Sequence, residues 1–469
     1  MSATEDEQQR LLQPGNNSSD NPEIVIASGC GASLPCDPRR KLHKYLVLII
    51  MCLLSFGSYF VYDNPAALQD VMERDLNLNN EKYMLFYALY SYPNVILCFF
   101  GGFLIDRVFG TRLGAIIFSS FVTIGHFLFA AGALVNKPGL MDFGRFVFGI
   151  GGESLCVTQN TYAVSWFKGK ELNMVFGLQL SLSRVGSTVN MNTMKPLYDH
   201  LASFMGIGHH TLGITLFIAG VFCVFSLLCA FAMAFFDKRA ERILKKKEAL
   251  TGETIRISDV KNFPLEVWLL SVICVAYYVT IFPFVDVGLL FYEMKFDQSA
   301  KLASLCNSLV YILSAAMSPF TGFAIDKTGR NVFWVIAGVV LTIISHGLLA
   351  FTFFNPFIPV VLMGFAYSIV ASALWPMASY IVPEYQLGTV YGLMQAIQNL
   401  GLATIAQAAG AIVDTKGYLL LEMFFLALLC IALIFSLLLY FVNAYKKGNL
   451  NLSTAKRKQL AKLEEKAAQ

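Results

Sequence analysis

Charged residues are scarce in this chain. Asp, Glu, Lys and Arg make up 14% of its 469 residues, whereas they make up about a quarter of a typical soluble domain. Hydrophobic residues make up 56%, and the mean hydropathy is +0.59. This balance excludes an ordinary soluble globular protein. It predicts an integral membrane protein in which the 35 glycines let helices approach one another closely.

The short patterns of common enzyme and metal sites are also absent. The sequence contains no Walker phosphate-binding loop, no HExxH stretch and no GxSxG stretch, so we expect no enzymatic activity. None of the ten cysteines has a partner at zinc-ligand spacing, which makes buried apolar cysteine the ordinary interpretation. We therefore predict no disulfide, no metal, no cofactor and no nucleic-acid partner.

Twelve apolar segments follow a polar N-terminal tail, and each is close to the ~20 residues that a spanning helix needs. We therefore predict an all-α membrane protein. Its expected 12 transmembrane helices lie at 44–66, 82–105, 113–135, 142–166, 172–194, 211–236, 264–291, 299–324, 331–353, 357–381, 387–412 and 420–444.

A long basic connector divides these spans into two sets of six. The predicted units are a disordered cytosolic tail (1–38), an N-terminal six-helix bundle (39–236), a cytosolic linker (237–262), a C-terminal six-helix bundle (263–445) and a cytosolic tail (446–469). We expect the linker to lie along the anionic cytosolic leaflet of the lipid bilayer. A specific lipid or partner site in the linker is the alternative.

Basic residues are concentrated on one side of the predicted spans. Lys and Arg occur next to both tails and in the loops 106–112, 167–171, 237–262 and 325–330, whereas the intervening loops contain few. Because basic loops mark the cytosolic side, we expect both termini in the cytosol.

Two opposite charges lie near the middle of consecutive apolar segments. Glu153 is in the fourth segment and Arg184 is in the fifth. A charge at the bilayer centre costs about 2.5–3.5 kcal/mol on insertion scales, so such residues usually face a protein interior or a water-filled cavity. We predict a central polar site that holds both ends of a zwitterion. The alternative is an ion pair that only ties the two spans together.

The two halves of the chain repeat one loop pattern. Gly102-Phe-Leu-Ile-Asp-Arg-Val-Phe-Gly-Thr-Arg follows the second span, and Gly322-Phe-Ala-Ile-Asp-Lys-Thr-Gly-Arg follows the eighth. We expect each acid to cap the next helix N-terminus and to pair with the basic residues, which would lock helices together on the cytosolic side. The residues of this cytosolic motif are Asp106, Arg107, Arg112, Asp326, Lys327 and Arg330.

These features resemble the major facilitator superfamily over about residues 40–445. The stretch Gly144-Arg145-Phe-Val-Phe-Gly-Ile-Gly also resembles the fourth-helix signature of that superfamily. The resemblance implies two pseudo-symmetric six-helix bundles that rock around a midplane site, without naming a substrate. We group Arg145 with the motif and gating residues and expect it to bond the first helix or a carbonyl. The first loop departs from the pattern by one inserted residue, Phe109, which is expected to distort its charge relay.

The N-terminal tail and two further stretches narrow the resemblance. Glu7 precedes Leu11 and Leu12 at the spacing of an acidic dileucine sorting signal, and the stretches 153–173 and 196–201 resemble the lysosomal dipeptide uniporters of the superfamily. Those uniporters pair with a heavily glycosylated single-span lysosomal membrane protein. The resemblance therefore implies a multi-pass protein of the lysosomal membrane, dipeptide substrates, that accessory subunit, and clathrin adaptors that bind the dileucine tail.

No glycosylation sequon falls in a predicted luminal loop. The three sequons begin at Asn16, Asn17 and Asn451, all in the predicted cytosolic tails. A glycosylated subunit that covers the luminal face would shield those loops from lysosomal proteases, which agrees with the implied partner.

A dipeptide would use the two central charges separately. Glu153 would accept the substrate ammonium, and Arg184 would bind the carboxylate with its guanidinium fork. Trp375 is expected to form an aromatic wall. The full predicted substrate site is Glu153, Arg184, Trp375, Asn399, Tyr278, Tyr90 and Tyr59. Further polar candidates are Tyr62, Asp63, Asn64, Tyr87, Gln159, Asn160, Tyr277, Asn307, Tyr311, Tyr367, Gln395 and Gln398. For each of these candidates, ordinary hydrogen bonding between helices is the alternative.

These expectations describe facilitated uniport of a broad range of dipeptides from lumen to cytosol by alternating access. The first span has no Glu and only one acid, Asp63, and the histidines do not cluster into a relay. Proton-coupled symport is therefore the alternative within transport. Transport of another small zwitterionic or organic solute, and a role as a non-transporting membrane scaffold, stay open as well.

Overall fold

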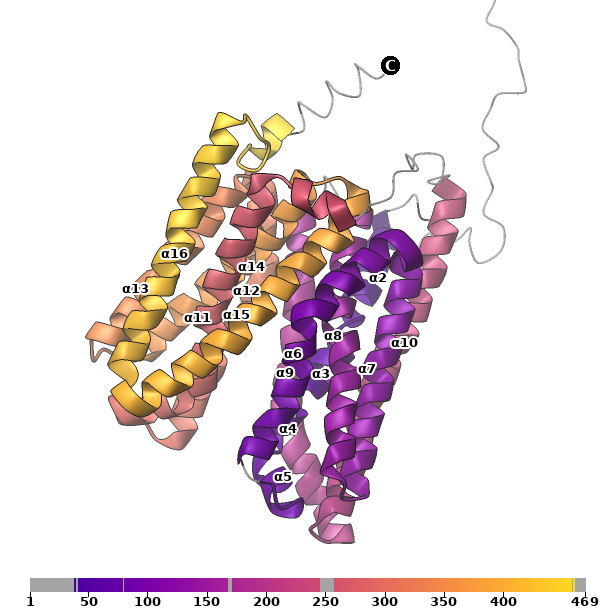
Figure 1. Ribbon diagram of the computed structural model, residues 1–469, viewed down its shortest axis with the longest axis vertical. Coiled ribbons are helices and arrows are strands. Elements are labelled where there is room, and N and C mark those ends of the chain that lie inside the picture. Colours follow the sequence, from indigo (N-terminus) through magenta and orange to yellow (C-terminus); the bar gives the residue numbers. More distant parts are fainter. Residues whose placement is uncertain are drawn as a thin grey trace, which may run out of the picture.

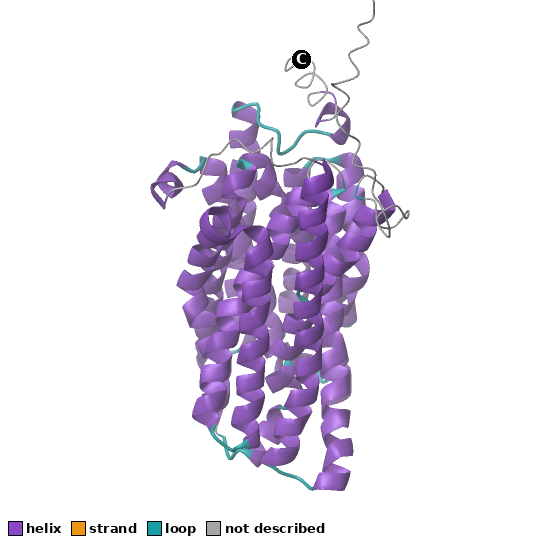
Figure 2. Cartoon of the chain, turned by 90° about the vertical axis from the view of Figure 1, so that its right-hand side faces the viewer, coloured by secondary structure: helices purple, strands orange, loops and turns teal. Residues whose placement is uncertain are grey.

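A computed structural model gives the structure of the protein and describes residues 38, 41–78, 80–167, 171–244, 257–457 and 459. These residues are almost entirely helical, and the β-bridge found among them joins Gly329 to Ser453. The long helices run side by side in two bundles (Figure 1 and Figure 2). The predicted all-α fold of two bundles is confirmed.

The N-terminal bundle begins with a first helix that is broken into pieces, and its other helices are long and continuous. Its elements are α2 (Lys41–Leu53), α3 (Phe56–Tyr62), α4 (Asn64–Ala67), α5 (Gln69–Asp75), α6 (Asn80–Leu104), η2 (Ile105–Phe109), α7 (Gly110–Leu134), α8 (Pro138–Phe167), α9 (Leu172–Met205) and α10 (His209–Leu244).

The C-terminal bundle has long helices at each position where a span is predicted. Its elements are η4 (Ile257–Asn262), α11 (Leu265–Phe296), α12 (Ala300–Thr328), α13 (Asn331–Phe351), α14 (Phe357–Ile381), η5 (Glu384–Gln386), α15 (Leu387–Lys416) and α16 (Tyr418–Tyr445).

Two of the long helices are less apolar than the rest. Nine stretches of the described residues are long and apolar enough to cross a membrane, and one of them, Leu85–Leu134, runs through both α6 and α7. Neither α8 nor α9 is among the nine. These helices carry Glu153 and Arg184 and bury many small polar side chains. Their polarity indicates that they line a polar interior.

Several segments differ from the predicted layout, including α10, which runs to Leu244 and so into the predicted linker. The predicted loop 67–81 contains the short helix α5, and α9 continues to Met205, well beyond its predicted end at residue 194. Pro196 lies inside α9 and does not end it. The helix ends at Gly206, whose φ of +83° lies in the left-handed region that favours glycine.

The first helix breaks where a polar side chain from α8 bonds its backbone. Nε2 of Gln159 donates to the carbonyl oxygen of Met51 at 2.8 Å, and the hydroxyl of Ser55 donates to Oε1 of Gln159. Side chains that insert into a helical ladder commonly cause such interruptions. Gln159 therefore fastens α8 to the junction between α2 and α3.

The two bundles contact one another mainly through two pairs of helices, α6 along α15 and α9 along α12, and less extensively where α9 meets α14 and α8 meets α15. The bundles are close at the end that carries the repeated loops and the C-terminal residues, and they spread apart toward the other end (Figure 1). We call the close end the motif end and define it by residues 106–112 and 326–330. The site between the bundles is therefore closed off at the motif end.

Candidate functional site

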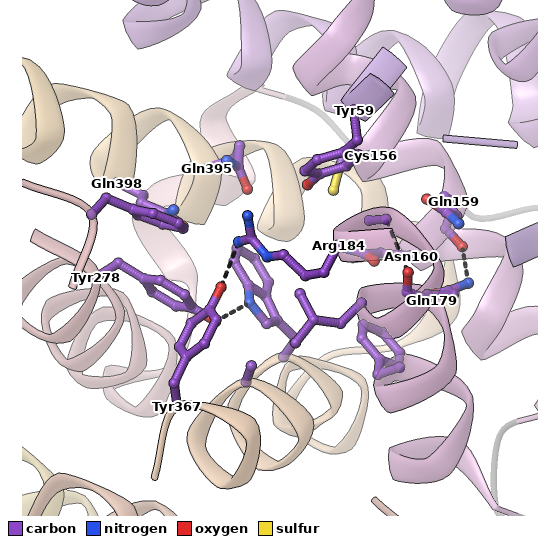
Figure 3. Close-up of a pocket in the computed structure, with 16 residues that line it drawn as sticks. Tyr59, Cys156, Gln159, Asn160, Gln179, Arg184, Tyr278, Tyr367, Gln395 and Gln398 are labelled. Atoms are coloured by element: carbon purple, nitrogen blue, oxygen red, sulfur yellow. Dashed lines mark hydrogen bonds between the residues drawn. The ribbon is translucent and has the colours of Figure 1, made fainter. Parts of the chain in front are cut away.

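A cavity lies between the two bundles. Helices α3, α8 and α9 supply one part of its lining, and α11, α14 and α15 supply the rest (Figure 3). The lining combines aromatic rings with side-chain amides. Its residues are Tyr59, Cys156, Gln159, Asn160, Phe176, Gln179, Leu180, Ser183, Arg184, Tyr278, Phe282, Tyr367, Ala371, Trp375, Gln395 and Gln398.

Arg184 extends from α9 toward the C-terminal bundle. Its Nη2 donates to the hydroxyl of Tyr367 on α14 at 2.6 Å (Figure 3). The guanidinium carbon lies 4.5 Å from the ring centre of Tyr311, and 5.3 to 5.9 Å from those of Phe282, Tyr367 and Tyr59. The residue is 8% exposed, and its Nε has no hydrogen-bond partner. Aromatic faces stabilise a cation, but a buried guanidinium with a spare N–H is suited to an anionic ligand.

Glu153 has different partners from Arg184. Its Oε1 accepts a hydrogen bond from the hydroxyl of Tyr90 on α6 at 2.9 Å, and the side-chain amide of Gln395 on α15 lies beside its carboxylate. The described structure therefore contains no ion pair between Glu153 and Arg184 that would only tie α8 to α9. Each charge lies on the N-terminal bundle and has a neutral partner on the C-terminal bundle.

Three further residues of the predicted substrate site line the cavity. They are Tyr59, Tyr278 and Trp375. Nε1 of Trp375 donates to the hydroxyl of Tyr278 at 2.9 Å. The aromatic wall expected from Trp375 alone therefore consists of two bonded rings from two helices.

Glu153, Tyr90 and Asn399 are outside the set of lining residues. Tyr90 contacts the carboxylate of Glu153. Nδ2 of Asn399 donates to the carbonyl oxygen of Gln395, one turn earlier on α15, at 3.0 Å. Gln395, which does line the cavity, connects both Asn399 and the Glu153 carboxylate to the site.

Several lining residues were not predicted from the sequence. Phe176, Leu180 and Ser183 share one face of α9 with Arg184, because their spacing follows the helical repeat. That spacing would have identified them once Arg184 was assigned to a cavity. Phe282 of α11 carries no polar signal, and only the fold places its ring against the guanidinium.

The acid of the first repeated loop bonds a helix of the other bundle. Asp106 accepts from the backbone N–H groups of Gly388 at 3.0 Å and Thr389 at 2.6 Å, and from the Thr389 hydroxyl at 2.7 Å. These groups belong to the first turn of α15, where N–H donors lack partners within the helix. We call this contact the first latch.

The acid of the second loop makes the equivalent contact from the C-terminal bundle to the N-terminal bundle. Asp326 at the end of α12 accepts from the backbone N–H groups of Asn173 at 3.1 Å and Met174 at 2.7 Å, in the first turn of α9. Nδ2 of Asn173 adds a bond of 2.7 Å. We call this contact the second latch. A carboxylate is also favoured at this position by the helix dipole.

The expectation that each acid caps the next helix along the chain was wrong. Neither α7 nor α13 has a side-chain cap at its N-terminus. Both acids bond across the bundle interface instead, because the partner helix there offers two unbonded N–H groups.

The basic motif residues lie around the two acids in different settings. Arg112 pairs with Asp237 at 2.5 Å and with Glu241, both on α10. The guanidinium of Arg107 lies 6.0 Å from the ring centre of Phe103. Lys327 is in the last turn of α12, and Arg330 precedes α13 with a φ of +58°.

The inserted Phe109 is accommodated within a helical turn between α6 and α7. Residues Ile105–Phe109 form the π-helical turn η2, which holds one residue more than an α turn. Asp106 lies within this turn and still reaches both N–H groups of α15. The insertion therefore changes the local winding and leaves the first latch intact.

Arg145 lies near the start of α8, away from the motif end. It is 2% exposed, and its Nη2 donates to the carbonyl oxygen of Tyr62 on α3 at 3.1 Å. The ring centre of Phe129 lies 4.7 Å from its guanidinium. Arg145 thus bonds a carbonyl of the first helix, as its place in the fourth-helix signature led us to expect.

Glycines at the start of both repeated patterns let the bundles touch. A Cβ on Gly102 of α6 would clash with the carbonyl oxygen of Gly388 on α15, and one on Gly322 of α12 would clash with that of Asn173 on α9. Either side chain would force backbone apart. The same motif position therefore permits close contact on both sides of the interface.

Some predicted functional residues lie outside the described part of the chain. They include the sorting residues Glu7, Leu11 and Leu12, the basic loop residues 168–170, and linker residues 245–256.

The family model described as Major Facilitator Superfamily matches residues 48–406. The chain belongs to the major facilitator superfamily. Among its superfamily relatives, the Homo sapiens protein named lysosomal dipeptide transporter MFSD1 is 56% identical over 457 residues, which cover 97% of this chain and 98% of that protein. The Danio rerio protein of the same name is 59% identical over 430 residues, which cover 92% and 93% of the two chains.

Solved structures of superfamily members have the same fold. FucP in the outward conformation aligns with a TM-score of 0.65 at 12% identity, over 84% of this chain and 99% of FucP. The proton:xylose symporter XylE bound to 6-bromo-6-deoxy-D-glucose aligns with a TM-score of 0.64 at 14% identity, over 85% and 95%. At these identities the likeness shows the fold alone.

Gly102→Ala should loosen the closed motif end, because the new Cβ would meet the Gly388 carbonyl oxygen. Overpacking of this kind costs about 1–3 kcal/mol, so we expect hydrogen exchange of the α15 first turn to rise about tenfold in the purified protein. Gly347→Ala in α13 is the control, because no atom lies within 4 Å of a Cβ built there. Equal exchange rates in the two variants would contradict the proposed role of Gly102.

Proposed function

We propose that this protein is a dipeptide uniporter of the lysosomal membrane, which transports a broad range of dipeptides from lumen to cytosol by alternating access. The observation that carries the proposal is the pair of opposite charges, Glu153 and Arg184, each of which faces a neutral polar side chain of the other bundle. Relatives named lysosomal dipeptide transporter, 56% and 59% identical over most of the chain, support the same substrate class.

The two ends of a dipeptide match these two charges. Arg184 has an unpartnered Nε and a bond to the Tyr367 hydroxyl, so a carboxylate can bind its fork bidentately and replace a neutral partner. Glu153 accepts from Tyr90 and retains acceptor capacity for an ammonium. Because each charge faces a polar side chain of the opposite bundle, a bound dipeptide would bridge the bundles at both of its ends.

The remaining lining suits a substrate with variable side chains. Asn160, Gln179, Gln395 and Gln398 bring amide groups to the cavity, and amides can both donate to and accept from a peptide group. Among the lining residues, Arg184 is the one that carries a formal charge. A cavity with mostly neutral walls therefore imposes little selection on substrate side chains.

We place the motif end in the cytosol, because the basic loops and both tails belong to that side. The structure then represents the state that faces the lysosomal lumen. Transport requires both latches to open while the opposite ends of the bundles approach, as in a rocking mechanism around a fixed midplane site.

Uniport fits the first helix better than proton symport does. The segments α2, α3 and α4 contain one acid, Asp63, which lies at the junction of α3 and α4. Glu153 is the remaining candidate proton carrier at the site, and it is held by two neutral donors. Proton-coupled symport through Glu153 is the alternative that measurements of dipeptide flux separate from uniport.

The protein also needs protection in a protease-rich lumen. Its predicted luminal loops contain no sequon, so we propose a glycosylated single-span lysosomal membrane protein as its accessory subunit. We further propose that clathrin adaptors bind the tail at Glu7, Leu11 and Leu12 and direct the protein to lysosomes.

Dipeptides should raise the thermal unfolding midpoint of the purified protein, whereas free amino acids and sugars should not. We expect Arg184→Ala to weaken dipeptide binding about a hundredfold, because a charge-assisted bidentate contact is lost. Glu153→Gln should weaken it about tenfold, because the Tyr90 bond survives and the charge does not. Lys137→Ala, at an exposed position on the luminal side, is the control.

Two outcomes of this screen would contradict the proposal. Amino acids or sugars that bind as tightly as dipeptides would assign another solute to the site. Binding of none of the three classes would favour a non-transporting scaffold.

Dipeptide flux into proteoliposomes at zero membrane potential should be the same at acidic and neutral pH, because uniport moves no proton with a zwitterion. A pH-sensitive dye inside the vesicles should report no acidification during flux. Glu153→Gln vesicles serve as the control for any residual signal. Acidification that follows dipeptide influx in the wild type and disappears in this variant would establish symport.

Removal of the accessory glycoprotein from cells should shorten the lysosomal half-life of this protein severalfold. Inhibition of lysosomal proteases should restore it, since the proposed role of the subunit is to shield luminal loops. An unchanged half-life would exclude shielding. Pro138→Ser, which converts Asn136-Lys137-Pro138 into a sequon at the exposed residue Asn136, should partly replace the subunit.

A further inference from the structure

The C-terminal residues fold back onto the second repeated loop. Residues 446–457, which we call the tail strap, begin where α16 ends. Leu450 of the strap is 3% exposed, and its N–H donates to Oδ1 of Asn443 on α16 at 3.2 Å. The N–H of Arg330 donates to the carbonyl oxygen of Leu452 at 3.1 Å. The strap is therefore anchored both to α16 and to the second repeated loop.

Two polar contacts of the strap end on Asp326 of the second latch and on the nearby residue Asn331 at the start of α13. The hydroxyl of Thr454 donates to the carbonyl oxygen of Asp326 at 2.7 Å. Nη2 of Arg457 donates to Oδ1 of Asn331 at 3.2 Å. Asn331 is fully buried, and its Nδ2 donates across the bundle interface to Oδ1 of Asn173 at 2.6 Å. A chain of bonds thus leads from the strap to the first turn of α9.

The Arg457 side chain is held in position from several directions. Its guanidinium lies 4.3 Å from the ring centre of Tyr380 on α14. Nη2 also donates to the carbonyl oxygen of Leu450 at 2.9 Å, and Nε donates to that of Asn449 at 3.2 Å. A guanidinium fixed in this way loses little freedom when it bonds Asn331.

The strap contacts the second latch, whereas the residues beside the first latch have other partners. At the first latch, Arg112 is paired with Asp237 and Glu241 of the same bundle. At the second latch, the strap backbone lies so close to Gly329 that a Cβ there would be 2.5 Å from the carbonyl oxygen of Leu452. The sequence repeats the loop in both halves, but the fold adds a separate segment to one of them.

We propose that the tail strap stabilises the closed motif end by orienting Asn331 and Asp326 for their contacts with α9. The bond between Asn331 and Asn173 crosses the bundle interface, so it exists only while the motif end is closed. Without Arg457, the buried oxygen of Asn331 loses its donor, which is costly for a buried amide. An interaction that favours one state shifts the population toward that state, so loss of Arg457 should favour opening.

Hydrogen exchange of the full-length protein in lipid nanodiscs tests this inference without any substrate. The N–H groups of Asn173 and Met174 report the second latch, and those of Gly388 and Thr389 report the first latch, because their partners are the two acids. We expect Arg457→Ala to accelerate exchange at both latches about tenfold. Thr454→Val, which removes the other strap contact, should act in the same direction.

Lys456→Ala is the matched control, because it removes an equal charge at the neighbouring exposed position. Faster exchange at both latches in Arg457→Ala, and not in Lys456→Ala, would support control of the bundle equilibrium. Faster exchange at Asn173 and Met174 alone would show that the strap only shields them locally and would overturn the proposal. Unchanged exchange in both Arg457→Ala and Thr454→Val would overturn it as well.

Discussion

A charge inside a membrane protein needs a partner, and in this structure the partner repeatedly comes from the opposite bundle. Water and lipid headgroups cannot supply one at the bilayer centre, so the protein itself must do so. Every such bond also holds the bundles in one relative orientation. Four contacts are of this kind: Arg184 with Tyr367, Glu153 with Gln395, Asp106 with the start of α15 and Asp326 with the start of α9. When the bundles rock, these internal charges must therefore exchange their partners.

This view explains why substrate binding and gating can be coupled with few charges. The central pair can exchange neutral protein partners for the charged ends of a ligand, which is a favourable exchange in a dry site. The latch acids have no such ligand, and their N–H partners must be replaced by water when the motif end opens. The energetic cost of opening therefore falls on the latches, and the gain that offsets it is available at the central site.

Much of the fold could be predicted from the sequence, because hydropathy and the repeated loop report directly on spans and halves. The twelve-span arrangement and the superfamily are confirmed. The placement of Glu153 and Arg184 in the interior also followed from their cost in lipid. The partners of the motif acids did not, because backbone N–H groups carry no sequence signature, and Asp106 and Thr389 are 283 residues apart. The long α9 and the ring of Phe282 beside Arg184 likewise depend on packing that no local pattern records.

The π turn at Ile105–Phe109 bears on how the two halves of the chain correspond. A residue added to a loop usually lengthens the excursion of the backbone and displaces whatever follows. Here the added residue widens one turn of helix, so the chain gains a residue without gaining reach. The two loops therefore correspond through the N–H groups that Asp106 and Asp326 bond. An alignment that counts residues from each acid would place the residues after it one position out of register. One residue more or less in this loop therefore changes how tightly the helix is wound, and the contacts between the bundles stay the same.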